Sequence, residues 1–347
     1  MANETKLSAA QELHSKSIVI DSCSFFCQGY DDRLERSGIT ALVLTTPWPH
    51  DNFDDGVQRI EEYYQLADKD PRLCLIETAE DIREAKRNGQ VGLILAAQNS
   101  STIGDRLSRV QTMARLGLRV MQLTYNERNH AGDGCNEPTD AGLSIFGRSL
   151  VSEMNRHGIL LDVSHAGART ASEAVAASDK PVIASHSNPF TLYPSGRNLS
   201  DELIDAISES GGVIGISPYG PINWDGDPEH PPTLENMMKA IDYIVERAGI
   251  DHVGIGSDRE ATKGAYPAEL QRKELSTIHE SHSTPTAYRE AFKHLSKYPI
   301  YRIEEYEGIH DHPKFAEALV RRGYGSEDVM KILGGNYLRV FEEVWPN

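Results

Sequence analysis

Short apolar runs recur along the whole chain, and they constrain its fold more than any other feature. Most are continuous rather than alternating, as in strands that are buried on both faces of a parallel sheet. Helical patterns separate them, which is typical of repeated strand–helix units. The sequence predicts eight such strands, at Ser17–Ile20, Ala41–Thr45, Val91–Ala96, Val120–Leu123, Leu160–Asp162, Val182–Ser185, Val213–Ile216 and Val253–Gly256.

The alternation of strands and helices fits either a doubly wound sheet or a closed barrel. Eight units in 347 residues favour an α/β fold of the (β/α)8 TIM-barrel type. The helices expected between the strands include Asp105–Leu116, Ser149–Arg156, Ala168–Ala177, Asp201–Ser210 and Leu234–Ala248.

No Pro-rich or Gly-rich linker divides the chain, so residues 1–347 are predicted to form a single domain. The segment 259–313 is long and polar, with many His, Tyr and Glu residues. We expect it to form a lid-like excursion over the barrel mouth. Two final helices are predicted after it, at Lys314–Arg322 and Ser326–Trp345.

The composition narrows the range of partners. A formal net charge of −17 argues against nucleic acids and anionic membrane surfaces, because both reward Lys and Arg. Four cysteines in 347 residues fit a reducing compartment. No signal-peptide pattern and no apolar run of membrane-spanning length is visible. We therefore expect a cytoplasmic protein that binds neither nucleic acids nor membranes.

In a barrel, functional groups gather at the carboxyl ends of the strands. Two histidines, an aspartate and several amides at one mouth would suit a divalent metal and an acid–base carboxylate. His165 and His186 stand in similar contexts, VSHAG and ASHSN, although a strand-end histidine can also be a structural residue with satisfied hydrogen bonds. The strand-end candidates are Asp21, Cys23, Gln98, Asn99, Tyr125, Asn126, His165, His186, Ser217, Tyr219 and Asp258.

Several longer motifs resemble a known family. The stretches GLSIFGRSLVSEMNRHGILLDVSHAG, PVIASHSNP and SGRNLSDELI are similar to the core of the renal (membrane) dipeptidases, peptidase family M19 of the amidohydrolase superfamily. DHVGIGSD resembles that family's GxGxDFDG strand, and GGNYLRVFEEVW resembles its closing helix. The resemblance is weak before residue 90 and strong from Leu116 to Asp258.

The resemblance implies roles for particular residues. It implies His165 and His186 as metal ligands, Arg197 as the group that binds a substrate carboxylate, and Asp258 as the catalytic carboxylate. It also implies a metal-dependent hydrolase and a homodimer, which is usual in the family.

The positions at which this sequence departs from the family pattern are as informative as the positions that match it. The family opens with D-G-H-x-D, whose His and Asp bind one of two zinc ions; here these two positions are Cys23 and Phe25. The glutamate that bridges the metals aligns with Gln98 in AAQNSS, and a neutral amide is a poor bridge. We therefore expect at most one divalent ion, zinc, held by His165 and His186 with Asp258 or Gln98. A protein without metal is the alternative.

A further departure affects the catalytic groups. The family's L-T-H-N histidine, which polarises the scissile group, aligns with Tyr125 in LTYN. We predict that Tyr125 and Asp258 act on the substrate, and that Arg197 and Asn126 bind it. Cys23 and Cys27 form a C-x3-C pair, either a soft-metal or thiol site or two small buried apolar residues.

Three functions remain open on the sequence alone. The first is a dipeptidase-like amidohydrolase that acts on an amide bond of a small amino-acid-derived substrate with at most one catalytic metal. The second is a non-peptidase enzyme of small N-methylated amine or betaine catabolism, and the third is a catalytically inactive family member.

Overall fold

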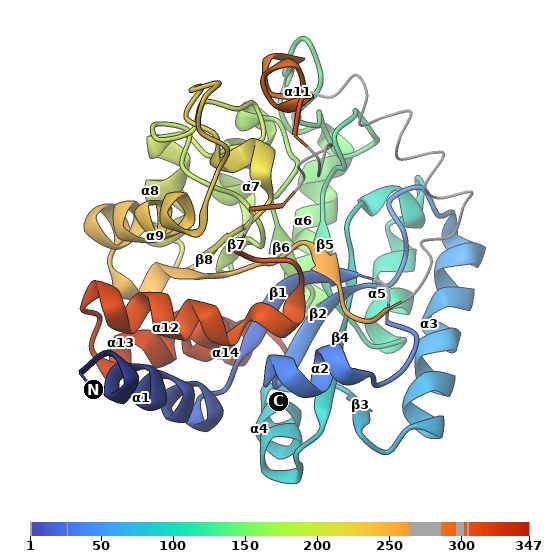
Figure 1. Cartoon of the computed structure of the whole chain (residues 1–347). Helices are drawn as coiled ribbons and strands as arrows, with labels where there is room; N and C mark the ends of the chain where they lie inside the picture. Colours follow the sequence, from blue (N-terminus) through green and yellow to red (C-terminus); the bar gives the residue numbers. More distant parts are fainter. Residues whose placement is uncertain (1, 26, 264–285, 296–301, 304, 347) are drawn as a thin grey trace.

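One parallel sheet curls around the centre of the molecule (Figure 1). The computed structural model describes residues 2–25, 27–263, 286–295, 302–303 and 305–346. The strands within them are β1 (Ile20–Phe25), β2 (Ala41–Thr45), β3 (Leu73–Leu75), β4 (Val91–Ala97), β5 (Leu118–Gln122), β6 (Leu160–Asp162), β7 (Val182–Ala184), β8 (Val213–Ile216), β9 (Val253–Ile255) and β10 (Arg259–Glu260).

The hydrogen-bonded strand order is β10-β1-β2-β4-β5-β6-β7-β8-β9, with β3 paired to β4 outside this path. Only residues 256–258 separate β9 from β10 along the chain, and β10 pairs in parallel with β1. The sheet therefore closes on itself. The prediction of an α/β fold of the TIM-barrel type is confirmed.

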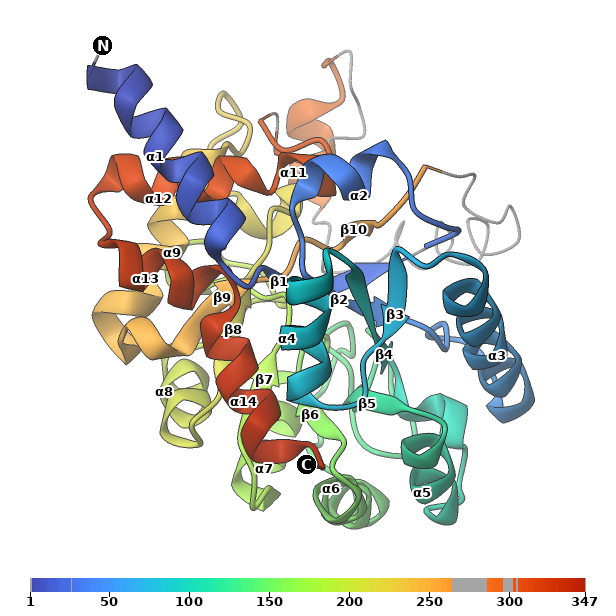
Figure 2. The ribbon, with the colours of Figure 1, turned by 90° about the horizontal axis from the view of Figure 1, so that it is seen from below.

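Helices surround the sheet (Figure 2). Those between β4 and β9 lie close to the predicted positions, and α7 and α9 have the predicted bounds. The helices are α1 (Ala2–Lys16), α2 (Asp32–Ser37), α3 (Phe53–Lys69), α4 (Ala79–Asn88), α5 (Ser108–Arg115), α6 (Ile145–His157), α7 (Ala168–Ala177), α8 (Asp201–Glu209), α9 (Leu234–Ala248), α11 (Thr286–Phe292), α12 (Pro313–Arg322), α13 (Ser326–Met330) and α14 (Asn336–Val344).

Local sequence signals set several helix ends. Ser144 and Ser200 accept hydrogen bonds from the first turns of α6 and α8 through their side chains. Thr233 and Asn236 form a capping box at the start of α9. Gly158 ends α6 with a φ of 67°, a left-handed conformation that glycine adopts without strain.

Apolar packing closes the amino-terminal end of the barrel, which we call the floor. The floor cluster consists of residues at the beginnings of β1, β2, β6 and β8 and of side chains from α4 and α14. In Figure 2, α4 and α14 lie in front of the strands, and Arg83 of α4 is paired with Glu342 of α14. The floor cluster includes Ile20, Ala41, Ile82, Ile94, Val120, Leu160, Ile183, Val213, Tyr337, Phe341 and Trp345.

The predicted position of the first strand was wrong. The strand begins at Ile20, where the prediction ended, and runs through a polar segment to Phe25. The polar side chains of this segment are buried, and hydrogen bonds satisfy them. Ser22 Oγ donates to the carbonyls of Ser185 and Ile255, at 2.6 and 2.9 Å. A polar strand of this kind has no apolar signature in the sequence.

The last predicted helix is interrupted. Residues 331–335 form a π-helical turn between α13 and α14, and Gly334 has a non-helical φ of 173°. A Cβ atom on Gly334 would lie 2.5 Å from the Ile18 carbonyl oxygen. The break therefore allows the helix pair to approach the backbone that leads into β1.

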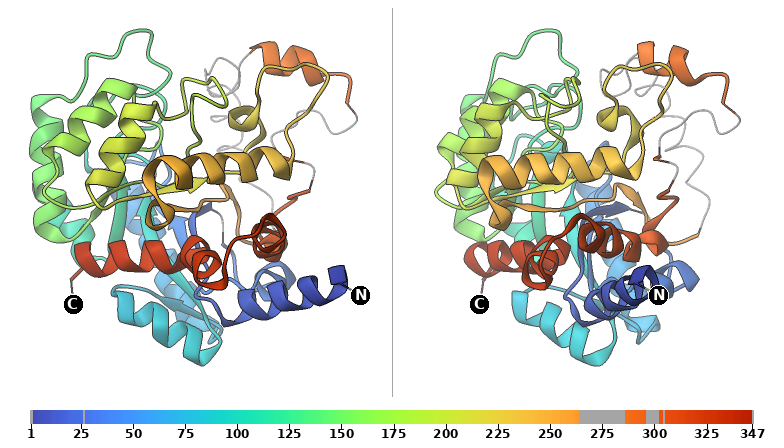
Figure 3. Two further views of the ribbon diagram at one scale, coloured as in Figure 1. Left: turned by 90° about the vertical axis from the view of Figure 1, so that its left-hand side faces the viewer. Right: turned by 60° about the vertical axis from the view of Figure 1, so that its left-hand side comes forward.

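Long connections gather at the opposite end of the barrel from the floor. In Figure 3 they form the upper part of the molecule together with α11, while the two termini lie lower. Most of the predicted lid-like excursion at 259–313 lies outside the described residues. Within its described part, Tyr288 and Phe292 of α11 contact Trp224 edge to face, with ring centroids 5.5 and 5.9 Å apart. Among all described helices, none is both long and apolar enough to cross a membrane.

Candidate active site

Four predicted or candidate residues converge at the carboxyl ends of β1, β6, β7 and β9. The Nε2 atoms of His165 and His186 are 2.9 Å apart. Cys23 Sγ lies 3.9 Å from Asp258 Oδ1. One potential ligand atom from each of Cys23, His186 and Asp258 lies within 4.8 Å of the other two. The structure thus brings together side chains that are up to 235 residues apart in the sequence.

Backbone strain marks the same place. Among the described non-glycine residues, only Asn126, His165 and Asp258 have a positive φ, of 60°, 64° and 51°. A left-handed backbone costs a non-glycine residue free energy, and it persists where the surroundings hold it. All three residues were singled out from their positions at strand ends. His165 and Asp258 belong to this cluster, and the side chain of Asn126 contacts His165.

A buried carboxylate holds the loop that carries His186. Asp162 Oδ1 accepts from the backbone N–H of Ser164 at 2.9 Å and of Ser185 at 3.0 Å. Asp162 Oδ2 accepts from Ser185 Oγ at 2.5 Å and from Gln122 Nε2 at 2.9 Å. The residues that precede both histidines are therefore tied to one side chain.

A second buried carboxylate repeats this arrangement beside Asp258. Asp21 Oδ1 accepts from the backbone N–H of Ser257 at 2.7 Å and of Cys23 at 3.2 Å, and Asp21 Oδ2 accepts from Ser257 Oγ. Sequence reasoning missed Ser185 and Ser257. The signal was present, because a serine directly precedes Asp258 as it precedes both histidines.

The partners of the two histidines fix which nitrogen carries the proton. His165 Nδ1 lies 2.7 Å from Asn126 Oδ1, which can only accept, so Nδ1 is protonated. Ser185 donates its hydroxyl proton to Asp162, so it accepts from His186 Nδ1, 2.7 Å away. Both Nε2 atoms then present lone pairs to each other at 2.9 Å. Two lone pairs at this distance repel unless a cation lies beside both.

Arg197 is a buried positive charge next to the histidines. It is 5% exposed and donates to Ser187 Oγ at 2.6 Å and to the His186 carbonyl at 2.8 Å. Within the described part of the chain no carboxylate pairs with it, so a structural salt bridge is not what holds it there. Guanidinium has five N–H donors, and the unused ones can bind an anion.

Burial and charge shift the titration of the site. Burial lowers the pKa of both His165 and His186 well below the usual range, and the charge of Arg197 adds to this effect. Burial raises the pKa of the Asp258 carboxyl, while Arg259 and Arg197 oppose part of the rise. Neutral imidazoles and a carboxyl with a raised pKa are typical of a metal or catalytic site.

The remaining predicted residues surround this cluster. The ring of Tyr125 stacks on His165, with centroids 4.4 Å apart and planes at 27°. Asn126 uses its side-chain oxygen to hold His165, as given above. Gln98 lies on the other side, where its Nε2 donates to Cys23 Sγ at 3.0 Å.

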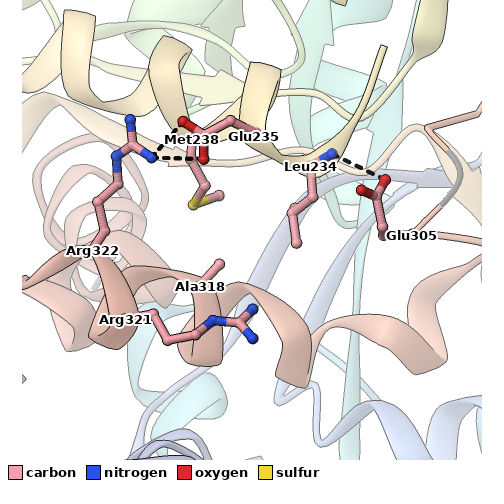
Figure 4. Close-up of a pocket in the computed structure, with 7 residues that line it drawn as sticks. All are labelled: Leu234, Glu235, Met238, Glu305, Ala318, Arg321 and Arg322. Atoms are coloured by element: carbon pink, nitrogen blue, oxygen red, sulfur yellow. Dashed lines mark hydrogen bonds and ion pairs between the residues drawn. The ribbon is translucent and has the colours of Figure 1, made fainter. Parts of the chain in front are cut away.

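Cys27 does not join Cys23 in a shared site. It packs in the main apolar core, and its thiol contacts the Gly29 carbonyl at 3.6 Å. A hollow of about 410 Å³ lies elsewhere, between α9 and α12 (Figure 4). On its wall Arg322 is paired with Glu235, and no residue of the strand-end cluster lines it.

Comparisons with known proteins agree with this architecture. The family model of "Membrane dipeptidase (Peptidase family M19)" matches residues 19–274. "Dipeptidase tcpJ" of Claviceps purpurea (strain 20.1) is 30% identical over 292 residues, which cover 84% of this chain and 58% of that protein. "Dipeptidase verJ" of Clonostachys rogersoniana is 28% identical over 291 residues, which cover 83% of this chain and 64% of that protein.

The chain thus spans less than two thirds of the length of these two dipeptidases. A crystal structure of an amidohydrolase from Pseudomonas aeruginosa has a TM-score of 0.84 and 30% sequence identity, and the match covers 97% of this chain and 99% of that one. The extent of the family-model match, together with the identity to these relatives, shows that this chain belongs to the membrane dipeptidase family, peptidase family M19.

Proposed function

We propose that the protein is a metal-dependent amidohydrolase that cleaves an amide bond of a small substrate carrying a carboxylate. Dipeptides are the substrate class named for its relatives. One observation carries the proposal: two facing histidine nitrogens, a carboxyl and a guanidinium with no carboxylate partner among the described residues meet at one end of the barrel. This combination can hold a cation, move a proton and bind an anion.

The residues of the site fit a single divalent ion. Two facing Nε2 lone pairs are satisfied by one shared cation, and His165 and His186 would hold it with Asp258 beside them. We propose zinc, since imidazole suits zinc and a neutral imidazole is the form that binds. When bound, such an ion polarises a carbonyl and lowers the pKa of its water.

Asp258 is the proposed general base and acid. Its carboxylate has two oxygens, so the group could help to hold the ion and still accept a proton from the attacking water. Its place beside His186 and Cys23 would let it hold that proton and return it to the leaving amine. We propose that the phenol of Tyr125, whose ring stacks on His165, donates to the scissile carbonyl of the substrate.

Metal stoichiometry is the first prediction. Phe25 cannot bind a metal, and Gln98 offers no charge to bridge two ions. We expect one tightly bound zinc equivalent per chain after purification without chelator, measured by inductively coupled plasma mass spectrometry. Two equivalents per chain would contradict the single-ion site.

Carboxylate binding is the second prediction. Replacing Arg197 by Lys keeps the charge but loses the planar fork, so the affinity for an anionic substrate analogue should fall by about 1–3 kcal/mol. Isothermal titration calorimetry with the wild type, Arg197→Lys and Arg197→Ala tests this. Equal affinities in all three would show that Arg197 is structural. Arg247→Lys, on the surface with Asp201 and Asp205, is the matched control.

The proposed activity is tested with a panel of dipeptides that includes L,L and L,D pairs. Amine release is measured with the zinc-loaded protein, the chelated protein and the chelated protein with zinc restored. Turnover that disappears with chelation and returns with zinc supports the proposal. No turnover of any substrate by zinc-loaded protein would leave a protein that binds but does not hydrolyse.

The cytoplasmic location and the homodimer predicted from composition and resemblance are part of this proposal. Light scattering coupled to gel filtration gives the mass in solution, and a monomer at all concentrations would contradict the dimer.

A further inference from the structure

We propose that the Cys23 thiolate is itself a ligand of the single metal ion, next to His165, His186 and Asp258. The family pattern has a histidine at this position, so the proposal assigns this chain a sulfur-containing ligand set of its own. The inference rests on the proposed function, because it requires that ion. It predicts a metal–sulfur bond that can be measured without any assay of activity.

The first support is geometric. Cys23, His186 and Asp258 each present a ligand atom within 4.8 Å of the other two. His165 is not in this group, but its Nε2 lies 2.9 Å from His186 Nε2. Ligands bound to one zinc lie at about 2.0–2.3 Å from it, so side-chain shifts on the order of 1 Å would let these atoms share an ion. Cys23 is 3% exposed, and its Sγ contacts Asp258 Oδ1 and Gln98 Nε2.

The second support is that the backbone of Cys23 is fixed from both sides. Its N–H donates to Asp21 Oδ1 at 3.2 Å, and its carbonyl accepts from the N–H of Asp258 at 2.8 Å. Asp21 also holds Ser257, the residue before Asp258. Cys23 and Asp258 are therefore positioned by the same elements, as outer-shell partners position metal ligands.

The third support is the chemistry of Gln98. Its Nε2 donates to Cys23 Sγ at 3.0 Å. An amide N–H stabilises an anionic sulfur, whereas a glutamate, which the family pattern has here, would place a second anion against it. The two departures, Cys23 and Gln98, thus fit each other. Gln98 acts as a positioning residue for the sulfur.

Ligation involves no redox step. The thiol loses its proton to solvent as the sulfur binds the ion, and both electrons of the new bond come from sulfur. A thiolate with imidazoles favours zinc or cobalt over magnesium and calcium, which prefer oxygen ligands. Cys27, four residues along the chain, also has a buried thiol, but it lacks these neighbours.

Extended X-ray absorption fine structure on the zinc-loaded wild-type protein tests the proposal directly. We expect a zinc–sulfur path at about 2.3 Å in addition to nitrogen and oxygen paths at about 2.0–2.2 Å. In the cobalt-loaded protein we expect thiolate-to-cobalt charge-transfer absorption in the near ultraviolet. Both signals should vanish in Cys23→Ser and persist in Cys27→Ser, the matched control.

Affinity gives a second measurement. Cys23→Ser should weaken zinc binding by more than the roughly 10–100-fold that loss of an outer-shell partner costs, and Gln98→Ala should weaken it within that range. If Cys23→Ser fails to fold, the wild-type spectrum alone decides.

Each outcome has one meaning. A bound zinc with only nitrogen and oxygen neighbours overturns the sulfur ligand and leaves the proposed hydrolase intact. A protein that binds no zinc overturns both. A sulfur path without turnover on any substrate upholds the ligand and overturns the proposed function.

Discussion

The Asp258→Asn variant is expected to fold normally and to lose about 10²–10⁴-fold in turnover, the usual contribution of a positioned acid or base. Asparagine keeps the size and most of the hydrogen bonds of aspartate but cannot take a proton from water. Asp258 lies three residues after the end of β9 and is the carboxyl that faces His186 and Cys23. The measurement is kcat on the best dipeptide of the panel, at saturating zinc.

The matched control is Asp251→Asn. This substitution removes one negative charge, as Asp258→Asn does. Asp251 also lies near β9, just before the strand, but its carboxylate pairs with Lys331 on the surface at 2.8 Å. We expect its turnover to be that of the wild type. Zinc content is measured in both variants, so that loss of the metal is distinguished from loss of the base. An Asp258→Asn variant with full zinc and wild-type turnover would remove Asp258 from the mechanism.

The second large effect is on stability. Gly215 of β8 and Gly256 after β9 both face the carbonyl oxygen of Ser185, where an added Cβ would lie at 1.9 and 2.0 Å. The Ser185 carbonyl belongs to the backbone, so it cannot avoid the added Cβ by a change of rotamer as a side chain could. We expect Gly215→Ala and Gly256→Ala to lower the free energy of unfolding by about 3 kcal/mol or more, at the upper end of overpacking costs.

Urea denaturation followed by circular dichroism gives these values. Gly325→Ala is the control, since a Cβ there meets only Asp328 Oδ2, at 3.6 Å, and the backbone φ is −68°. Its free energy of unfolding should change by less than about 1 kcal/mol. If Gly256→Ala is as stable as this control, β7 and β9 can separate without cost, and the tight closure of the barrel is not needed for folding.

Continuous apolar strands could be predicted from sequence because burial on both faces leaves a direct composition signal. The strands β2, β6 and β8 have the predicted bounds. β1 could not be predicted in this way, because its Asp21, Ser22 and Ser24 are polar and are satisfied by partners that the barrel alone brings close. Ser24 Oγ, for example, donates to the Arg259 carbonyl at 2.8 Å.

The residues of the candidate site could be predicted from the sequence to about the same extent as the strands. The rule that function lies at strand ends identified His165, His186 and Asp258, and the structure brings them together. It could not reveal which imidazole nitrogens face each other, since that depends on Asn126 and on the Ser185–Asp162 pair. Nor could it place Cys23 beside Asp258, because no local pattern relates residues 235 positions apart.

The floor of the barrel has a consequence for synthesis on the ribosome. Among the residues that the structure describes, every strand has been made once β10 ends at Glu260. Phe341 and Trp345, which cover the starts of the strands, follow much later. At roughly 5–20 residues per second, the ribosome needs on the order of ten seconds to make that interval. Throughout it, the nascent barrel has an open apolar end, and a chaperone that binds such a surface would have its opportunity then.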